Sequence, residues 1–276
     1  MSIISRICGS LEARLNQPRL SIWRTIYFNF RTLPLSQAIK LPVFIYGRVR
    51  LYMLNGSVEF KDTAIKRGMV KIGINADSFN LSDGSGFISL TSAESKIIFK
   101  GPAKIALNSK IRVIADGILT FGEYAFIGSN IRIICNGGRV NIGAFSRIAF
   151  ETIIMNSSFH HVYNYKKNSI TRATRPIEIG NFNWIGNRTT LAAGTKTKEY
   201  SIIGAGSYLN RDYSSIEEEY PMIAGHPAKI ITSGIKRIYS PELENDVIQW
   251  FNEHPNEEVY RPEEFNDIIN NITREF

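Results

Sequence analysis

The chain has 276 residues and a formal net charge of +8, with 43% hydrophobic and 21% charged residues. These proportions are those of a globular protein and exclude a disordered one. No apolar run reaches the roughly 18–20 residues that cross a bilayer, and no nucleic-acid-binding motif occurs. We therefore expect no nucleic-acid partner, and the positive charge is compatible with an anionic ligand or surface.

The cysteines and the opening of the chain indicate a cellular location. Only Cys8 and Cys135 occur, so a disulfide framework is not expected and a reducing cytoplasm is favoured. The opening apolar run is interrupted by Arg6, Glu12 and Arg14 and does not resemble a signal peptide. The sequence thus predicts a cytoplasmic protein, with the inner face of the membrane as a second location.

Residues 1–68 form a first segment without an internal repeat. It contains the aromatic stretch SIWRTIYFNF at 21–30, and its first fifty residues carry eight cations against one acid. One interpretation is an N-terminal cap that packs on the open end of the following domain and covers a strand edge. The other is a peripheral membrane contact, with Trp23, Tyr27 and Phe28 among lipid headgroups and arginines beside them.

Residues 69–234 carry a repeat of about six residues, which is clearest from residue 177 onward. An aliphatic residue followed by a small one recurs at Ile179-Gly180, Ile185-Gly186, Leu191-Ala192 and Ile203-Gly204. This period fits neither a helical turn of about 3.6 residues nor the alternation of a strand. It is typical of a coil with one inward aliphatic side chain per short strand and a small residue at each bend. The sequence therefore predicts a mainly β protein built on a parallel β-helix.

The repeat is interrupted between Asn156 and Ile177 by a polar, basic and aromatic stretch that contains His160 and His161. A long insertion in a regular solenoid generally forms a loop on one face, and such loops tend to carry function. A neutral imidazole is the usual group that removes a proton from a hydroxyl near neutral pH. The insertion is therefore the first place to look for a catalytic base.

Helix signals follow the repeat. Ser240-Pro241 provides an N-cap and a first-turn proline, and Pro262 with two following glutamates opens a second helical pattern. Apolar residues recur at helical spacing after both starts. Residues 235–276 are therefore predicted to form a short C-terminal helical extension that packs against the rest of the chain.

Three ordered motifs close the repeat: IG-x-x-x-WIG from Ile179 to Gly186, IGAGS from Ile203 to Ser207, and AG-x-PAK from Ala224 to Lys229. On these motifs the chain resembles the hexapeptide-repeat acyltransferases, left-handed β-helix enzymes that use acetyl-CoA. Among them it is most similar to bacterial sugar and polysaccharide O-acetyltransferases. By position, the resemblance implies a CoA site between coils that is lined by Trp184, Asn187, Ala205, Asn210, Arg211 and Lys229.

The same resemblance assigns the catalytic residues. The family's histidine precedes the last coils, which places the base at His160, with His161 as the alternative because the match can slip by one residue. Glu151 occupies the place where galactoside-type members carry an asparagine that positions the acceptor. It is predicted either to orient His160, as a carboxylate orients an imidazole, or to form a structural salt bridge.

The function that the resemblance implies is acetyl-CoA-dependent O-acetylation of a sugar hydroxyl in capsule or surface-polysaccharide biosynthesis, with a histidine as the general base. Transfer is expected to be direct, without a metal, and within a homotrimer that binds a sugar or glycan acceptor. An N-acetyltransferase acting on an amino sugar and a non-catalytic structural or membrane-docking β-helix are the alternatives.

A γ-carbonic-anhydrase-like metal site is not expected, because the histidines lack the spacing of three zinc ligands. A serine O-acetyltransferase is disfavoured by the composition of residues 1–68.

Overall fold

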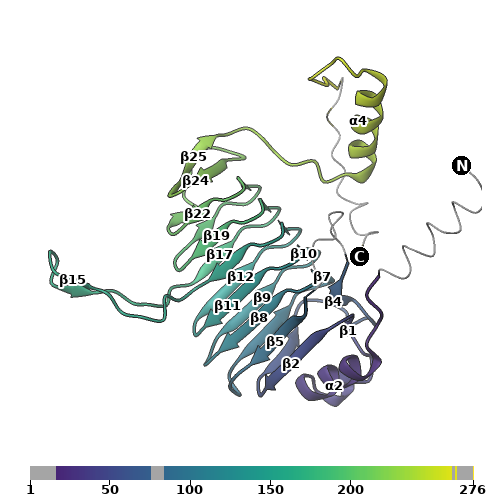
Figure 1. Ribbon diagram of the computed structural model, residues 1–276, viewed down its shortest axis with the longest axis vertical. Helices are drawn as coiled ribbons and strands as arrows, with labels where there is room; N and C mark the ends of the chain where they lie inside the picture. Colours follow the sequence, from purple (N-terminus) through teal and green to yellow (C-terminus); the bar gives the residue numbers. More distant parts are fainter. Residues whose placement is uncertain (1–16, 76–83, 263–264, 266–275) are drawn as a thin grey trace, which may run out of the picture.

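The computed structural model describes residues 17–75, 84–262, 265 and 276, and its main body is a parallel β-helix (Figure 1). The chain winds through three sheets in turn, so each coil adds one strand to each sheet. Two of the sheets have seven strands each, which gives seven coils in the described part of the chain. The predicted fold, a mainly β chain wound as a left-handed parallel β-helix, is confirmed.

The strands fall into three sheets, and their order within each sheet follows the coils. The first sheet contains β1 (Val43–Ile45), β4 (Val70–Ile74), β7 (Ala103–Ala106), β10 (Ala125–Ile127), β13 (Arg147–Ile148), β18 (Trp184–Ile185), β21 (Ile202–Ile203), β24 (Met222–Gly225) and β25 (Ala228–Thr232). The second sheet contains β2 (Val49–Leu54), β5 (Gly86–Leu90), β8 (Lys110–Ile114), β11 (Arg132–Asn136), β14 (Ile153–Met155), β19 (Thr190–Ala192) and β22 (Tyr208–Leu209). The third contains β3 (Ser57–Phe60), β6 (Lys96–Phe99), β9 (Ile118–Phe121), β12 (Arg139–Ile142), β17 (Ile177–Ile179), β20 (Lys196–Thr197) and β23 (Asp212–Tyr213).

Inward side chains stack in register along the coil axis. In the first sheet Ile127, Ile148, Ile185 and Ile203 are successive partners, and each is buried. The second sheet repeats the arrangement with Ile111, Ile133, Ile154, Leu191 and Leu209. One aliphatic residue in each six-residue unit therefore fills the interior. Removal of this apolar surface from water is the main force that holds the coils together.

The coil begins earlier than the sequence pattern indicated. The strands β1, β2 and β3 lie within residues 43–60 and pair in parallel with β4, β5 and β6 of the next coil. The predicted boundary at residue 69 thus falls inside the β-helix, after its first coil. The sequence pattern did not indicate the first coil, because its strands VFI, VRLYML and SVEF lack the aliphatic residue followed by a small one that marks the later coils.

In the described part of the chain, two helices precede the first coil: α2 (Ile22–Thr32) and α3 (Leu35–Ala38). The helix α2 lies against β1 and β2 at the N-terminal end of the coil (Figure 1). At the other end, β25 turns back antiparallel to β24, and α4 (Pro241–Glu253) follows. The Ser240 hydroxyl accepts a hydrogen bond from the Leu243 backbone N–H, as an N-cap should. The second predicted C-terminal helix, after Pro262, lies outside the described residues for most of its length.

The three corners of the coil use a repeated backbone conformation. We call the bends between the first and second sheets the first corner, those between the second and third sheets the second corner, and those between the third and first sheets the third corner. The first corner carries Asn108, Asn130, Glu151 and Arg188, all with φ between +56° and +60°. The third corner carries a ladder of aromatic residues with positive φ: Tyr124, Phe145, Phe182, Tyr200 and Tyr220. Ring centroids of Phe145 and Phe182 lie 4.8 Å apart, so stacking offsets part of the conformational cost.

Two further predictions concern the membrane and the cysteines. No helix among the described residues is long and apolar enough to span a bilayer. Cys135 is buried, and burial raises the pKa of its thiol to about 12. A thiol with that pKa is almost entirely protonated at neutral pH, so Cys135 is a poor nucleophile. Cys8 lies outside the described residues.

Candidate functional site

The insertion at the second corner forms a projecting arm, which we define as residues 156–176. It leaves the coil after β14, carries the antiparallel pair β15 (Tyr163–Asn164) and β16 (Ser169–Ile170), and returns at β17. Figure 1 shows the arm extending well beyond the body of the coil. Apolar side chains on it are exposed, including Val162 at 67% and Tyr165 at 89%. The predicted loop is therefore a defined hairpin whose side chains have few contacts with the coil.

The stem of the arm is fastened to the coil by Asn156, which is fully buried. Its side-chain amide donates to the carbonyl of Gly137 at 2.7 Å, and its Oδ1 accepts from the Asn136 backbone N–H at 2.8 Å. The returning strand is held in turn, because the Arg175 backbone N–H donates to the Asn156 carbonyl at 3.0 Å. One asparagine thus joins the outgoing strand, the returning strand and the preceding coil.

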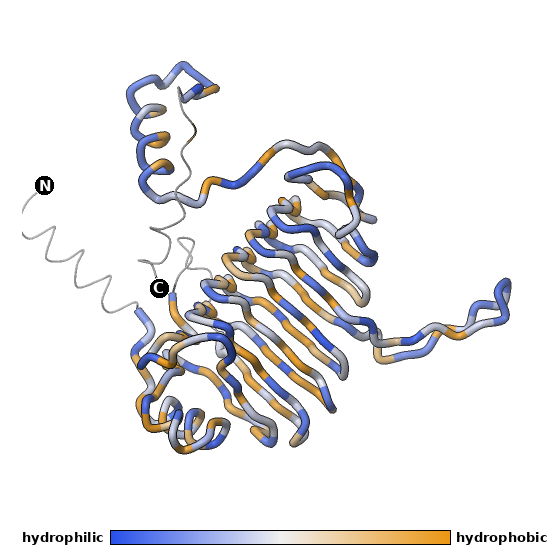
Figure 2. Tube along the Cα trace, turned by 180° about the vertical axis from the view of Figure 1, so that it is seen from behind, coloured by the Kyte–Doolittle hydropathy of each residue, from blue (hydrophilic) through white to orange (hydrophobic). Residues whose placement is uncertain are grey.

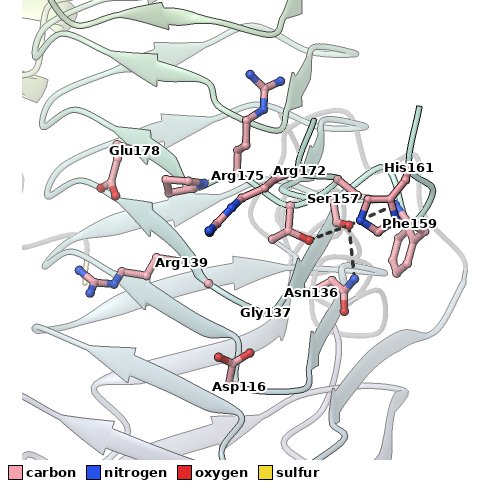
Figure 3. Close-up of a pocket in the computed structure, with 14 residues that line it drawn as sticks. Asp116, Asn136, Gly137, Arg139, Ser157, Phe159, His161, Arg172, Arg175 and Glu178 are labelled. Atoms are coloured by element: carbon pink, nitrogen blue, oxygen red, sulfur yellow. Dashed lines mark hydrogen bonds between the residues drawn. The ribbon is translucent and has the colours of Figure 1, made fainter. Parts of the chain in front are cut away.

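Ser157 is the centre of a second network at the root of the arm (Figure 3). Its hydroxyl oxygen lies 3.0 Å from the Thr174 hydroxyl, accepts from the Asn136 side-chain amide at 3.3 Å, and accepts from the Phe159 backbone N–H at 3.1 Å. Ser157 and Thr174 also form an isolated antiparallel bridge. These contacts fix the backbone directly before the two histidines, so the direction of the following residues is set by the coil.

A cavity of about 700 Å³ lies between the root of the arm and the second corner. Its polar and charged lining residues are Asp116, Asn136, Arg139, Ser157, His161, Arg172, Thr174, Arg175 and Glu178. The volume lies within the range of small-molecule sites, which is about 300–1,000 Å³. Figure 3 shows the labelled side chains arriving from the arm and from the turns of several successive coils.

The charged groups of the cavity favour an anionic ligand. Three arginines line it against two carboxylates, and Oε2 of one carboxylate, Glu178, accepts a hydrogen bond from the Asn141 side chain at 2.6 Å. The Arg175 guanidinium lies close to Gly194 on the next coil. A Cβ atom added to Gly194 would lie 2.9 Å from Cζ of Arg175. Gly194 also has φ of +87°, a conformation that favours glycine. The glycine therefore leaves room for the guanidinium.

The two predicted base candidates occupy different positions. His161 lines the cavity, whereas His160 is not among its lining residues. The His160 backbone carbonyl accepts a hydrogen bond from the Ser158 hydroxyl at 2.9 Å, which closes a tight turn with Phe159 at φ of +62°. Because of this turn, it is the second histidine of the pair that lies among the arginines and Ser157.

Glu151 does not orient His160 within one chain. It lies at the first corner, where its Oε2 forms an ion pair with Arg188 Nε at 2.7 Å. The histidines lie on the arm, which leaves the second corner, and the whole of β14 separates the two bends. Of the two predicted roles, the structure therefore shows the salt bridge. The residues are only nine apart in sequence, but a triangular coil places such neighbours at different corners.

The chain is similar to proteins of known structure and not to known families of sequences. No protein-family model matches it, and no curated protein sequence matches it. Among solved structures, the polySia-specific acetyltransferase NeuO is similar with a TM-score of 0.54 and 19% identity, over 79% of this chain and 84% of that chain. This chain has the fold of the hexapeptide-repeat acetyltransferases.

Other solved structures with this acyltransferase fold match less well. The N-acyltransferase AntD from Bacillus cereus, in complex with dTDP and 3-hydroxybutyryl-CoA, has a TM-score of 0.38 and 15% identity over 76% of this chain and 88% of that chain. A galactoside acetyltransferase in complex with coenzyme A has a TM-score of 0.33 and 18% identity over 76% of each chain. Scores this low add nothing about the reaction of the present chain.

The residues predicted to bind CoA are spread over the last coils of this acetyltransferase fold. Asn187 and Ala205 lie in successive bends of the first corner, and Gly206 N–H donates to the Asn187 carbonyl at 2.9 Å. Asn210 and Arg211 lie at the second corner, between β22 and β23. The remaining two, Trp184 and Lys229, lie in β18 and β25 of the first sheet. None of the six lines the cavity beside the arm.

Several residues of the cavity were not predicted. Asn136, Ser157, Arg172 and Arg175 were passed over because no motif marks them. The signal that was available is the composition of the insertion, which is polar and basic directly beside the histidines. Asp116 and Arg139 belong to earlier coils, and only the stacking of the second corner brings them to the cavity.

Proposed function

We propose that this protein is an acetyl-CoA-dependent O-acetyltransferase that modifies a hydroxyl group of a sugar in a capsule or surface polysaccharide. The observation that carries the proposal is the cavity beside the arm, in which one imidazole lies among polar and cationic side chains. The acetyltransferase fold supports it. A hydroxyl is a weak nucleophile near neutral pH and needs a base close by, which His161 supplies.

The reaction we propose is a direct transfer. Acetyl-CoA supplies an acyl group activated as a thioester. The unprotonated nitrogen of His161 accepts the proton of the sugar hydroxyl as that oxygen bonds to the acyl carbon. The carbon–sulfur bond breaks, and the leaving sulfur takes a proton from the imidazolium, which restores the base. Cys135 has no part in this scheme because burial keeps its thiol protonated.

The acceptor we propose carries a carboxylate or phosphate. Arg139, Arg172 and Arg175 face the same space as His161, and a guanidinium binds such groups through two parallel hydrogen bonds. The fold relative NeuO is specific for polySia, an acceptor of this charge class. The arginines would fix the anionic group and leave a neighbouring hydroxyl beside the imidazole.

The active assembly we propose is a homotrimer. The arm of one subunit would close against the first corner of the next, where Asn187 and Ala205 lie. This arrangement supports the proposal in two ways. It would cover the exposed apolar side chains of the arm, and it would bring Asn187 and Ala205, which lie at the first corner, to His161 on the arm. Glu151 shares the first corner and would face the incoming arm.

The test is an acceptor screen with labelled acetyl-CoA over neutral sugars, sialic acid polymers and phosphate-bearing glycans. We expect saturable transfer to an anionic glycan, with the label released by hydroxylamine as an ester is. A label that resists hydroxylamine would indicate an amide and favour the N-acetyltransferase alternative. Absence of acetyl-CoA binding in calorimetry would overturn the proposal altogether, whereas binding without transfer would overturn the acceptor class.

A further inference from the structure

The helix α2 turns a polar face toward the coil, which is the reverse of an ordinary surface helix. Its buried residues are Thr25, Phe28, Asn29 and Thr32, and three of these four are polar. Phe28 is fully buried in the core, so it does not lie among lipid headgroups as the membrane interpretation predicted. The Asn29 side chain donates to the Val43 carbonyl at 2.7 Å and accepts from the Val43 N–H at 3.2 Å, while Thr25 Oγ1 accepts from the Ile45 N–H at 3.0 Å. These hydrogen bonds satisfy backbone groups at the free edge of β1. The inward face of α2 therefore covers the end of the first sheet.

The outward face of α2 is consequently apolar and lies in solvent. Trp23 is 83% exposed, Ile22 63%, Tyr27 55% and Phe30 48%. The apolar surface continues past the helix to Leu35 and Ile39, which are also exposed. Figure 2 shows that the helix at the N-terminal end of the coil carries both hydrophobic and hydrophilic positions. Side chains of this size, adjacent to one another and uncovered, mark an interaction surface.

The charge around this face has one sign. Residues 17–58 contain six arginines and lysines and no aspartate or glutamate. Arg24 and Arg31 are exposed on α2 itself, beside Trp23 and Tyr27. A shallow groove of about 600 Å³ between α2 and β2 is lined by Trp23, Arg24, Tyr27 and Arg50 among others. Aromatic rings beside arginines in an open groove fit a negatively charged headgroup.

We propose that the outward face of α2 docks on an anionic phospholipid membrane. The helix lies in the headgroup region with Trp23, Ile26 and Phe30 toward the acyl chains and the arginines toward lipid phosphates. A second copy of this chain is a poor occupant, because a symmetric contact would place the same cations against one another. The absence of acids in 17–58 instead complements a surface that is uniformly negative.

The experiment is co-sedimentation of the full chain with vesicles of phosphatidylcholine, with and without phosphatidylglycerol. We expect binding to the vesicles that contain phosphatidylglycerol, and weaker binding as salt is added. Trp23→Ser combined with Phe30→Ser should weaken binding at least about tenfold, because two large apolar side chains no longer leave water. Arg24→Gln combined with Arg31→Gln should remove the preference for phosphatidylglycerol.

The matched control is Ile248→Ser, which removes an exposed apolar side chain from α4 and should leave vesicle binding unchanged. Circular dichroism checks that each variant is folded, and if the apolar double variant is not, the arginine double variant decides. Indifference of the wild-type protein to phosphatidylglycerol would overturn the proposal. So would a change of oligomeric state in the apolar double variant by light scattering, since a second copy would then cover this face.

Discussion

The side chains of the coil and those of the arm differ in how they are packed. In the coil, each inward residue lies between equivalent residues of the coils before and after it, as Ile148 lies between Ile127 and Ile185. In the arm, β15 pairs only with β16, and the apolar side chains of both strands are largely exposed. The coil is thus stabilised by repetition, whereas the arm is stabilised at its root and open beyond it. The coil fixes the root of the arm, and the arm carries the histidine that we propose as the base.

The largest effect is expected from His161→Ala, which removes the proposed chemistry of the arm without touching the coil. Turnover should fall by about 10²- to 10⁴-fold, the usual contribution of a general base. The melting temperature should stay the same because the side chain is exposed. The matched control is His160→Ala, which should retain most activity. A dead His160→Ala with an active His161→Ala would move the base by one residue, and two active variants would remove the imidazole mechanism.

A smaller effect is expected from Asn156→Ala, which breaks the joint between the two regions. The change leaves the Asn136 N–H and the Gly137 carbonyl without the side-chain partners they now have. The free energy of unfolding in urea should fall by about 1–3 kcal/mol, the cost of unsatisfied buried polar groups. Turnover should fall as well, because the root of the arm moves. Asn164→Ala, in the exposed part of the arm, is the control and should change neither; equal stability of the two variants would contradict the role of Asn156.

The smallest effect is expected within the coil, from Asp212→Asn. Lys196 Nζ lies 2.8 Å from Asp212 Oδ2, and its hydrogen bond, together with those from Ser214, lowers the pKa of Asp212 to about 2. The folded pKa is below the unfolded value of about 3.9, so the pair stabilises the fold above that pH and ceases to do so as the pH falls toward 2.

The midpoint of denaturation should therefore be slightly higher in the wild type than in Asp212→Asn at neutral pH. The difference should shrink between about pH 4 and pH 2. The gain is small because both side chains are more than one-third exposed to water. Lys196→Met should show the same pH dependence. A difference that grows as the pH falls would mean that the ion pair does not stabilise the fold.

Sequence patterns predicted the coil because its regularity is local. The pairs Ile185-Gly186 and Ile203-Gly204 each indicate one inward side chain and one bend. This interpretation needs no information about residues that are distant in the sequence. The first coil was missed because its strands do not follow that step. Its stability comes from pairing with the second coil and from α2, and both are contacts that a local pattern does not contain.

The site was predicted less completely because it depends on which corner a residue occupies. Glu151 and His160 are close in sequence and lie at different corners, whereas Asp116 and Arg175 are far apart and line one cavity. The insertion itself was predicted from the break in the repeat. Which of His160 and His161 lines the cavity was not predicted, since this depends on a turn at Phe159 with positive φ, a conformation that is uncommon for phenylalanine.

Because the coils are evenly spaced, the number of coils between two elements fixes the distance between them along the coil axis. Four strand-to-strand steps separate β1, beside α2, from β13, whose coil bears the arm. At about 4.8 Å for each step, the coil that bears the arm lies about 19 Å along the axis from β1, the strand beside α2. If that helix rests on a lipid surface, the number of intervening coils determines how far from the bilayer a glycan is modified. Insertion or deletion of one complete coil would then change that height by about 5 Å.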